Sequence, residues 1–396
     1  MLGAQGLAWV ALLTVLLRSS TVPWQAIWFW AVLFRCAGFF ATPVLEDDWF
    51  RCLWDGRMLA LTGNPYASAP IASFGDPTVP EPFQRILDQV NHPDVPTIYG
   101  PVCQYAFAAS YAVAPGQLWP WKLLLLAADL LALGMLRRLG GGWKPMLFFA
   151  WCPLLILETA FNAHPEMLAV AFFVGAVAAR RPRMTAVLCA GAVGAKIFAI
   201  LLVPLILWTQ PRRAWWIFGT ALALLYAPFW LQGSAADLAG LRTMAAQWEF
   251  NSSAFALLSG AISDPVARSV CAVAFITIWL GLVWRWALGG ATADRSPTAL
   301  LRTAGVIFGS FLLLSPTVNP WYLLWLLPGV ALAPSCAGVV ALAAVSLSYA
   351  TGLNLPDPAL RNFELAGWVR PVEYGAIGLA LLADFRRFTA RAATAR

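Results

Sequence analysis

The stretch from Val266 to Leu282, VARSVCAVAFITIWLGL, decides the fold class of this chain. Its length and its apolar side chains suit a helix that crosses a lipid bilayer. A similar run, VRPVEYGAIGLALL, extends from Val369 to Leu382, and others recur along all 396 residues. The chain is 60% hydrophobic and only 11% charged, whereas soluble domains carry about 25% charged residues. This composition excludes a soluble protein, because it could not cover a water-facing surface.

We expect the apolar runs to form roughly 11 to 13 membrane segments, several of them short, at about 17 to 25 residues for each span. Lipid offers the backbone no hydrogen-bond partners, so these segments should be helices. The sequence therefore predicts an all-α polytopic membrane protein with one transmembrane domain over residues 1–396. Residues 2–17 lack the basic start and cleavage site of a signal peptide, and we expect a retained first helix there.

Basic residues lie in short clusters between the apolar runs, which is the positive-inside pattern of cytoplasmic loops. The clusters are Arg137, Arg138 and Lys144; Arg180, Arg181 and Arg183; Arg212 and Arg213; and a tail over residues 386–396, which we predict to be cytoplasmic. The net charge of +7 therefore indicates membrane topology and argues against a nucleic-acid partner.

Residues 45–102 have the opposite character, with eight acidic side chains, three basic ones and many prolines. This composition predicts a large first loop on the outer face. Because each span carries the chain to the opposite face of the membrane, we also expect outer loops at residues 232–253, 315–321 and 354–368. By the same reasoning, residues 99–114 fit only as a short re-entrant segment. Several polar segments thus gather at one face, as expected of an enzyme that works at the outer membrane surface.

The 28 residues between Arg183 and Arg212 do not fit a single span. Both arginines are expected inside, and Lys196 lies near the middle of the segment. We predict a hairpin of two half-helices, because broken helices at membrane depth are tolerated where they line a cavity.

The strongest constellation of polar residues is EDDWFRCLWDGR at 46–57, followed by GNPY at 63–66. Its apolar positions recur at helical spacing, and Gly63 before Asn-Pro is a helix stop. We predict an interfacial helix over residues 49–61, with its Trp side chains at headgroup depth and three carboxylates at its start.

Adjacent carboxylates repel one another, which raises the pKa of at least one of them and makes it a better proton acceptor. This chemistry suits a general base placed where a water-borne hydroxyl meets a lipid-anchored donor. The structural alternatives are helix N-capping by Asp47 or Asp48 and an Arg51–Asp55 pair one turn apart.

The Asp-Asp-x-x-Arg-x-x-Trp-Asp-Gly-Arg pattern at 47–57, with GNPY, resembles the first outer loop of bacterial GT-C glycosyltransferases. It is most similar to the polyprenol-phosphate-mannose-dependent mannosyltransferases. Supporting stretches are NHPDVPTIYGP at 91–101, NAHPE at 162–166, WEFNSS at 248–253 and NPWY at 319–322. The NAHPE stretch resembles a His-Asn-Asp element in which Pro165 and Glu166 replace the last two residues. The resemblance covers about three quarters of the chain in order.

The resemblance implies a GT-C-like bundle in which the loop at 45–102 carries interfacial helices and the catalytic motif. It also implies a mechanism in which an acidic residue of this loop deprotonates the acceptor hydroxyl. The oxygen attacks the anomeric carbon with inversion, and the lipid phosphate leaves without needing an acid. Asp48 is the expected base and Asp47 the second candidate.

A departing phosphate requires positive charge. Lys196 is the first candidate, because an intramembrane ionisable residue is functional by default, although snorkelling to the inner interface is its alternative. Arg51 and Arg57 are further candidates for phosphate contact, and His92 is a candidate donor to it.

The other predicted substrate-binding residues are Tyr99, His164, Glu166, Glu249, Asn251, Asn319, Trp321 and Tyr322. For His164, a contact with the donor sugar and a helix-capping role are equally good interpretations. Glu249 could bind substrate or form an ion pair with Arg242. An aromatic belt explains the aromatic candidates equally well. For Asp129, inside an apolar run, we expect a structural hydrogen bond.

No metal-ligand spacing is present, and we expect no required cofactor, although adjacent carboxylates suit Mg²⁺ or Mn²⁺. The expected partners are a polyprenyl-phosphate-linked sugar donor, a glycolipid, glycan or protein acceptor, and the bilayer. Mannose follows only from the resemblance, and glucose, galactose and arabinose stay open. The resemblance places the active site on the periplasmic side of a bacterial inner membrane. A transporter or flippase for a lipid-linked sugar and a structural envelope subunit are the competing functions.

Overall fold

The computed structural model describes residues 2–233, 238–289, 294–351 and 364–394. Within these ranges every regular element is a helix, and the one β-pairing is an isolated bridge between Phe250 and Thr317. The chain divides into two compact units. The first unit comprises residues 1–32, 139–156 and 249–396, and the second comprises residues 33–138 and 157–248. The predicted all-α fold is confirmed, whereas most of the outer loop expected at 354–368 lies outside the described residues.

Several described helices suit a membrane. Four are long and apolar enough to cross one: Trp119–Arg138, Trp143–Phe161, Asp264–Leu288 and Pro297–Leu314. Shorter apolar helices cover Leu2–Arg18, Trp24–Phe40, Glu166–Ala178, Ile197–Leu207 and Cys336–Ala350. The chain is thus a polytopic membrane protein with several short segments, and the number of 11 to 13 spans stays a prediction.

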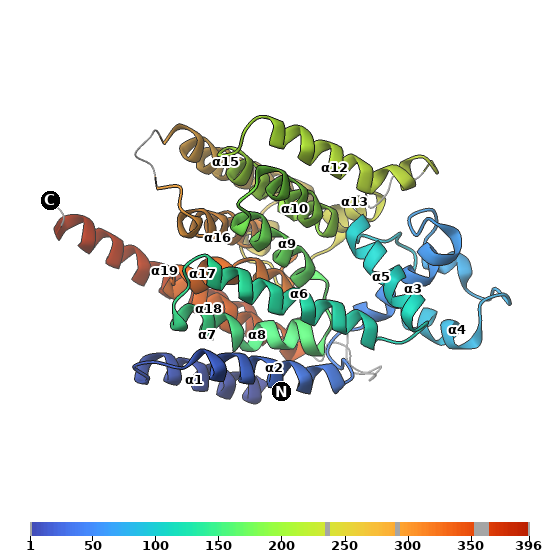
Figure 1. The fold of residues 1–396 in the computed structure, drawn as a ribbon, viewed down its shortest axis with the longest axis horizontal. Helices are drawn as coiled ribbons and strands as arrows, with labels where there is room; N and C mark the ends of the chain where they lie inside the picture. Colours follow the sequence, from blue (N-terminus) through green and yellow to red (C-terminus); the bar gives the residue numbers. More distant parts are fainter. Residues whose placement is uncertain (1, 234–237, 290–293, 352–363, 395–396) are drawn as a thin grey trace. The chain divides into compact units, whose positions relative to one another are not determined.

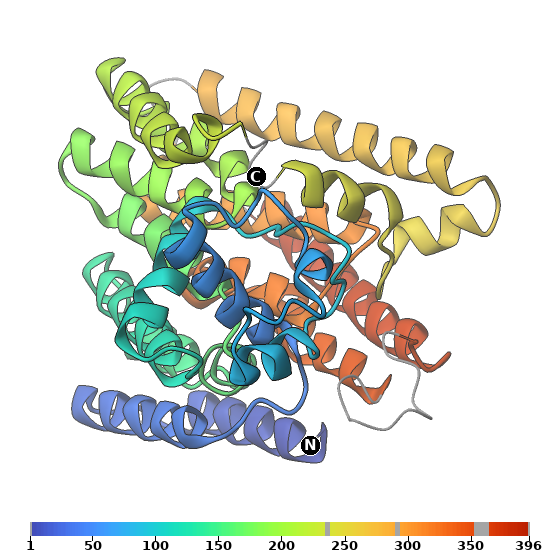
Figure 2. The same cartoon turned by 90° about the vertical axis from the view of Figure 1, so that its right-hand side faces the viewer.

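The second unit contains the conspicuous acidic motif. Its helices are α3 (Asp48–Thr62), α4 (Glu81–Leu87), α5 (Pro101–Val113), α6 (Trp119–Arg138), α9 (Glu166–Ala178), α10 (Pro182–Ala195), α11 (Val203–Leu207), α12 (Arg213–Trp230) and α13 (Leu238–Gln247). It also includes 3₁₀ segments at Pro70–Ser73 and Ile197–Leu202 and a π-helical segment that ends at Phe161. Helix α10 packs against α9 and α12, and α3 packs against α5 (Figures 1 and 2).

The first unit is built from α1 (Leu2–Arg18), α7 (Trp143–Ala150), α8 (Pro153–Leu155), α14 (Ala254–Ser259), α15 (Asp264–Leu288), α16 (Pro297–Leu314), α17 (Leu327–Leu332), α18 (Cys336–Ala344) and α19 (Val369–Thr394). Two 3₁₀ segments, Pro320–Trp325 and Val345–Thr351, complete it, and α2 (Trp24–Phe40) runs from this unit into the second. Helix α16 packs against α15 and α17, and α18 packs against α19 (Figure 1).

Helix α3 is the helix predicted from the acidic motif. It ends at Gly63, whose left-handed φ of 75° lets its N–H bond the carbonyl of Leu59, so the predicted helix stop is confirmed. Its apolar side packs on α4, where Trp54 and Leu53 contact Phe83 and its neighbours. Trp54 is only 2% exposed. The loop folds back and buries this side chain in protein, which the sequence did not predict, and the headgroup depth of Trp54 stays a prediction.

Gly56 allows the close crossing of α3 and α5. A Cβ at this position would lie 2.5 Å from the carbonyl oxygen of Phe107, which is backbone and cannot rotate away. We expect Gly56→Ala to lower the free energy of unfolding by about 1–3 kcal/mol through overpacking. Thermal unfolding in detergent measures this. Gly134→Ala on α6 is the control, because open space surrounds that position and alanine favours the helix; equal unfolding temperatures for the two variants would contradict the prediction.

The segment around Lys196 is broken as predicted. Helix α10 ends at Ala195, Lys196 has extended backbone angles, and the chain continues as the 3₁₀ segment Ile197–Leu202 and then α11. Both later pieces contact α10, which confirms the hairpin of half-helices.

Asp129 makes the structural interaction expected of it. Its carboxylate accepts hydrogen bonds from Arg35 Nε at 2.6 Å and Nη2 at 3.0 Å, and both side chains are buried. A buried pair of this kind is costly to break from one side. The pair joins α2 to α6 within the second unit.

Candidate active site

Helix α6 holds the two chain segments that carry the acidic motif and the NAHPE stretch. Lys122 donates to the carbonyls of Gly38 and Ala41, at 2.9 and 2.6 Å, at the end of α2, where positive charge is favourable. The indole of Trp121 donates to the carbonyl of Ala163 at 2.8 Å. One helix therefore positions both the peptide that leads to Asp48 and the residue before His164.

Asp47 and Asp48 share one hydrogen-bond donor. The amide of Asn91 donates to Asp47 Oδ1 at 2.7 Å and to Asp48 Oδ1 at 2.9 Å, and the Tyr99 hydroxyl donates to Asp48 Oδ2 at 3.1 Å. Asp47 occupies the N-cap position of α3 but makes no capping hydrogen bond. The capping alternative for Asp47 is therefore wrong, and its carboxylate is available for other chemistry. The side chain of Asp48 keeps 22% of its surface exposed.

A second layer of ionisable groups lies behind Asp48. His164 Nδ1 is 3.7 Å from Asp48 Oδ2, and His164 Nε2 is 3.7 Å from Glu158 Oε2. Glu158, on the π-helical segment, accepts a hydrogen bond from Asn162 at 3.1 Å. Glu46 is only 2% exposed, and neither of its carboxyl oxygens has a hydrogen-bond partner in the described structure. Carboxyl groups that are buried this close together are either protonated or paired with a positive charge.

Burial and mutual repulsion set the protonation of this cluster. Burial, and then the charge of Asp48, raises the pKa of Asp47 to about 7 despite the hydrogen bond that Asp47 accepts. Burial raises the pKa of Glu46 well above its usual range, with Asp48 and Glu158 adding to the effect. Burial lowers the pKa of His164 to about 4, so its imidazole is neutral at neutral pH. Glu46 and Asp47 therefore keep their protons at a higher pH than ordinary carboxyls, whereas His164 does not carry a second proton.

Lys196 lies at the break after α10 and pairs with Glu166. Its Nζ is 2.5 Å from Glu166 Oε1, and it lies 5.9 Å from the ring centroid of Tyr99 and 5.7 Å from that of Phe198. Both side chains of this ion pair are buried. Because the Tyr99 hydroxyl donates to Asp48, the carboxylate and the ammonium both contact this residue.

Arg51 and Asp55 hold the loop that carries Tyr99. Arg51 donates to Asp55 at 3.0 Å and to the carbonyl of Val95 at 2.9 Å. Gln104 donates to the other oxygen of Asp55 and to Thr97, both at 3.0 Å. The predicted Arg51–Asp55 pair is confirmed. Because this guanidinium is buried and bonded within the fold, its geometry favours a role in positioning the loop over phosphate contact.

Arg57 and His92 lie at the edge of this cluster. Arg57 stacks over the rings of Trp54 and Phe83, at 5.6 and 5.3 Å. His92 is exposed, stacks on Trp248 with ring centroids 4.4 Å apart, and has a φ of 45°. Ala163, before His164, also has a positive φ, of 63°. Such strain in residues other than glycine persists where surrounding contacts enforce it, often at functional sites.

The remaining predicted residues belong to the first unit. Glu249 pairs with Arg370 at 2.5 Å, which corrects the alternative pairing with Arg242. Asn251 has a φ of 46°, donates to both oxygens of Glu373 and accepts from the Tyr374 hydroxyl. The side chains of three further predicted residues in the same unit are buried: Asn319, Trp321 and Tyr322. The predictions that these residues bind substrate stay predictions.

A comparison with protein families identifies the kind of enzyme. Residues 2–212, a little over half of the chain, match a family described as alpha-(1->6)-mannopyranosyltransferase, N-terminal domain. The chain belongs to this mannosyltransferase family. No curated protein and no solved structure matches it. The predicted resemblance to mannosyltransferases is confirmed, the protein is a glycosyltransferase, and its chemistry requires a sugar donor and an acceptor.

Sequence reasoning missed the roles of three residues that the structure places at this mannosyltransferase's carboxylate cluster. Asn91 lies in a quoted motif, but only the fold shows that it bridges both aspartates. Glu158 stands in an apolar run, and that position alone marks an intramembrane ionisable residue as a candidate. Glu46 was noted as part of the acidic run, but its burial is visible only in the structure.

Metal binding finds no direct support in the mannosyltransferase's geometry. Among the residues that the structure describes, no group of three or more His, Cys, Asp or Glu side chains converges as metal ligands. The prediction that no divalent cation is required stays a prediction.

The protonation of Asp47 makes a testable contribution to the mannosyltransferase's stability. A pKa raised to about 7 means that the folded state binds this proton more tightly than the unfolded state. The resulting stabilisation is present below the ordinary pKa of an aspartate and is lost as the pH rises through 7. We expect Asp47→Asn to raise the unfolding temperature by a few degrees at about pH 8 and to leave it nearly unchanged at about pH 4. Thermal unfolding at both pH values measures this, and equal shifts at the two would argue against a buried, protonated Asp47.

Proposed function

We propose that this protein transfers a mannosyl group from a polyprenyl-phosphate donor to an acceptor hydroxyl, with inversion, at the extracytoplasmic face of the membrane. The observation that carries the proposal is that a partly exposed carboxylate, Asp48, and a buried ammonium, Lys196, both lie against Tyr99. Such a pair offers a proton acceptor for one substrate and a counter-charge for the phosphate of the other.

In the proposed reaction, Asp48 takes the proton of the acceptor hydroxyl as the oxygen attacks the anomeric carbon. The new bond joins this oxygen to the sugar, and the bond between the sugar and the phosphate oxygen breaks. The phosphate leaves with both electrons of that bond. Hydrogen bonds from Asn91 and Tyr99 orient Asp48, and the exposed part of its carboxylate stays open to the hydroxyl. A positioned base of this kind contributes roughly 10²–10⁴-fold to a rate.

Lys196 supplies the positive charge for the departing phosphate. Its ion pair with Glu166 keeps an ammonium charged inside the protein. A lipid phosphate that enters beside Tyr99 shares this ammonium with Glu166. The attraction grows during the reaction, because the donor phosphodiester carries one negative charge and the departing phosphate monoester carries up to two.

His164, Glu158 and Glu46 act behind Asp48. A neutral His164 that donates from Nδ1 toward Asp48 leaves Nε2 as an acceptor that faces Glu158. The raised pKa of Glu46 favours the neutral acid beside Asp48, so the negative charge is kept on Asp48, where the reaction needs it. Catalytic hydrogen bonds are often long before substrate binds, which is consistent with the 3.7 Å separations.

The extracytoplasmic side is supported by charge. The segment 45–102 that carries Asp48 is acidic, whereas the basic clusters follow the positive-inside pattern. An α-linked product, which the family description names, requires a β-linked donor if a single displacement inverts the anomeric carbon.

The test is transfer by purified protein in detergent or proteoliposomes. The donors compared are polyprenyl-phosphate-β-[¹⁴C]mannose and a nucleotide-linked mannose, each with envelope glycolipids as acceptors. We expect labelled product from the lipid donor only, with an α linkage by NMR. Transfer from the nucleotide sugar alone, or a β-linked product, would overturn the proposal. Movement of the lipid donor across the bilayer without product would support a flippase.

A further inference from the structure

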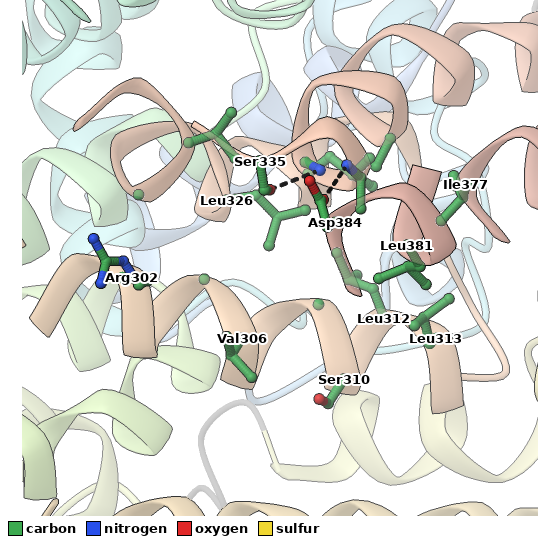
Figure 3. Close-up of a pocket in the computed structure, with 18 of the residues that line it drawn as sticks. Arg302, Val306, Ser310, Leu312, Leu313, Leu326, Ser335, Ile377, Leu381 and Asp384 are labelled. Atoms are coloured by element: carbon green, nitrogen blue, oxygen red, sulfur yellow. Dashed lines mark hydrogen bonds between the residues drawn. The ribbon is translucent and has the colours of Figure 1, made fainter. Parts of the chain in front are cut away.

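A cavity in the first unit takes no part in the chemistry above. Its volume is about 600 Å³, and α16, α17, α18 and α19 surround it (Figure 3). A volume of this size is ample for part of a small ligand. Most of its lining is aliphatic or glycine, which suits a hydrocarbon and not a sugar.

The cavity is long and open along α16. Arg302 and Leu313 both line it and lie at opposite ends of this stretch of the helix in Figure 3. At a rise of 1.5 Å per residue their separation along the axis is about 16 Å. One leaflet of the hydrocarbon core is about 15 Å thick. Between these ends, Gly305 and Gly309 have no atom within 4 Å of where a Cβ would stand, so the helix surface facing the cavity is uncovered.

The two ends of the cavity differ in charge. At one end, Arg302 lines the cavity and is exposed. Arg387 follows the lining residue Asp384 by three positions on α19, and its guanidinium is 3.0 Å from Cys336 Sγ. Asp384 also lines this region, but its carboxylate accepts from the backbone N–H groups of Cys336 and Ala337 where α18 begins. At the other end, Glu373 is buried and bonded to Asn251. Positive charge is therefore presented at the Arg302 end.

We propose that this cavity binds an acyl chain of an anionic phospholipid, with the phosphate at Arg302 and Arg387. Arginine binds phosphate through several N–H donors, and basic pockets between transmembrane helices on the cytoplasmic side suit anionic lipid headgroups. The basic C-terminal end of α19 and the start of α16 fit the cytoplasmic side by the positive-inside rule. The chain length of a phospholipid matches the length of the cavity, and its anionic headgroup matches the charged end.

The experiment fills the cavity from its open face. Gly309→Leu places a side chain in the cavity, where no atom lies within 4 Å of the Cβ position. Gly281→Leu places the same side chain on α15, where Gly281 is exposed and its Cβ position is equally open. Native mass spectrometry of the purified proteins counts bound lipid. We expect wild type and Gly281→Leu to retain one phospholipid and Gly309→Leu to lose it at least 10-fold.

Delipidated wild type provides a second measurement that does not depend on how the variants fold. Phosphatidylglycerol added to it should raise the unfolding temperature more than phosphatidylcholine does, and Arg302→Gln should remove that difference. Equal effects of the two lipids on wild type, equal lipid retention by both leucine variants, or polyprenyl phosphate as the retained lipid would each overturn the proposal.

Discussion

Asp48→Asn should lower kcat by about 10²–10⁴-fold, because it removes the proposed proton acceptor while keeping the shape of the side chain. The amide oxygen of an asparagine can still accept from Asn91, and its NH2 group can donate to the Tyr99 hydroxyl oxygen, so the loop and α3 should keep their structure. The donor KM should change little, since the lipid phosphate binds elsewhere. Initial rates with polyprenyl-phosphate-mannose at saturating acceptor measure both constants.

Asp94→Asn is the matched control for this variant. Asp94 is an exposed carboxylate in the same segment, so its replacement makes the same change of charge without touching the cluster. We expect it to retain wild-type kcat. If Asp48→Asn also retained it, Asp48 could not be the base, and Asp47 would be the next residue to test.

Lys196→Gln should raise the donor KM by about 10- to 100-fold, because a hydrogen bond from a charged group to phosphate is worth about 1.5–3 kcal/mol. The single variant also leaves Glu166 buried without its counter-charge, which should cost about 3–5 kcal/mol of stability. The double variant Lys196→Gln/Glu166→Gln removes both charges and should fold more stably than the single one while keeping the weak donor binding.

The buried pair Arg35–Asp129 supplies the control for the lysine experiment. The double variant Arg35→Gln/Asp129→Asn removes a buried ion pair from the same unit, and neither residue is a predicted substrate-binding residue. It should change the unfolding temperature but leave the donor KM as in wild type. A similar rise in KM for both double variants would mean that Lys196 acts through stability and not through phosphate.

Local patterns explain which features were predictable. Helix α3, its stop at Gly63 and the break at Lys196 depend on residues within a turn or two of each other, so the sequence contains the information directly. The burial of Trp54 does not, because it depends on α4 folding back over α3. A partly apolar helix has the same pattern whether protein or lipid covers it.

The candidate site shows the same division. Asp47, Asp48 and Lys196 stand out by charge in unusual places, whereas the bridging role of Asn91 joins residues more than 40 positions apart. Glu158 lies close to His164 because its segment is π-helical, which no sequence pattern predicts. Contacts of this kind arise from packing, and packing depends on the whole chain.

By itself, the sequence determined that this protein is helical, crosses a membrane and concentrates acid in one long loop, because composition and charge act through the surrounding solvent and need no partner in the fold. Tertiary structure alone decided that Asp47 is not a helix cap, that Arg51 is bonded within the loop, and that Glu46 and Glu158 lie buried beside Asp48. The physical reason is that a side chain's hydrogen bonds and desolvation depend on neighbours brought together only by folding.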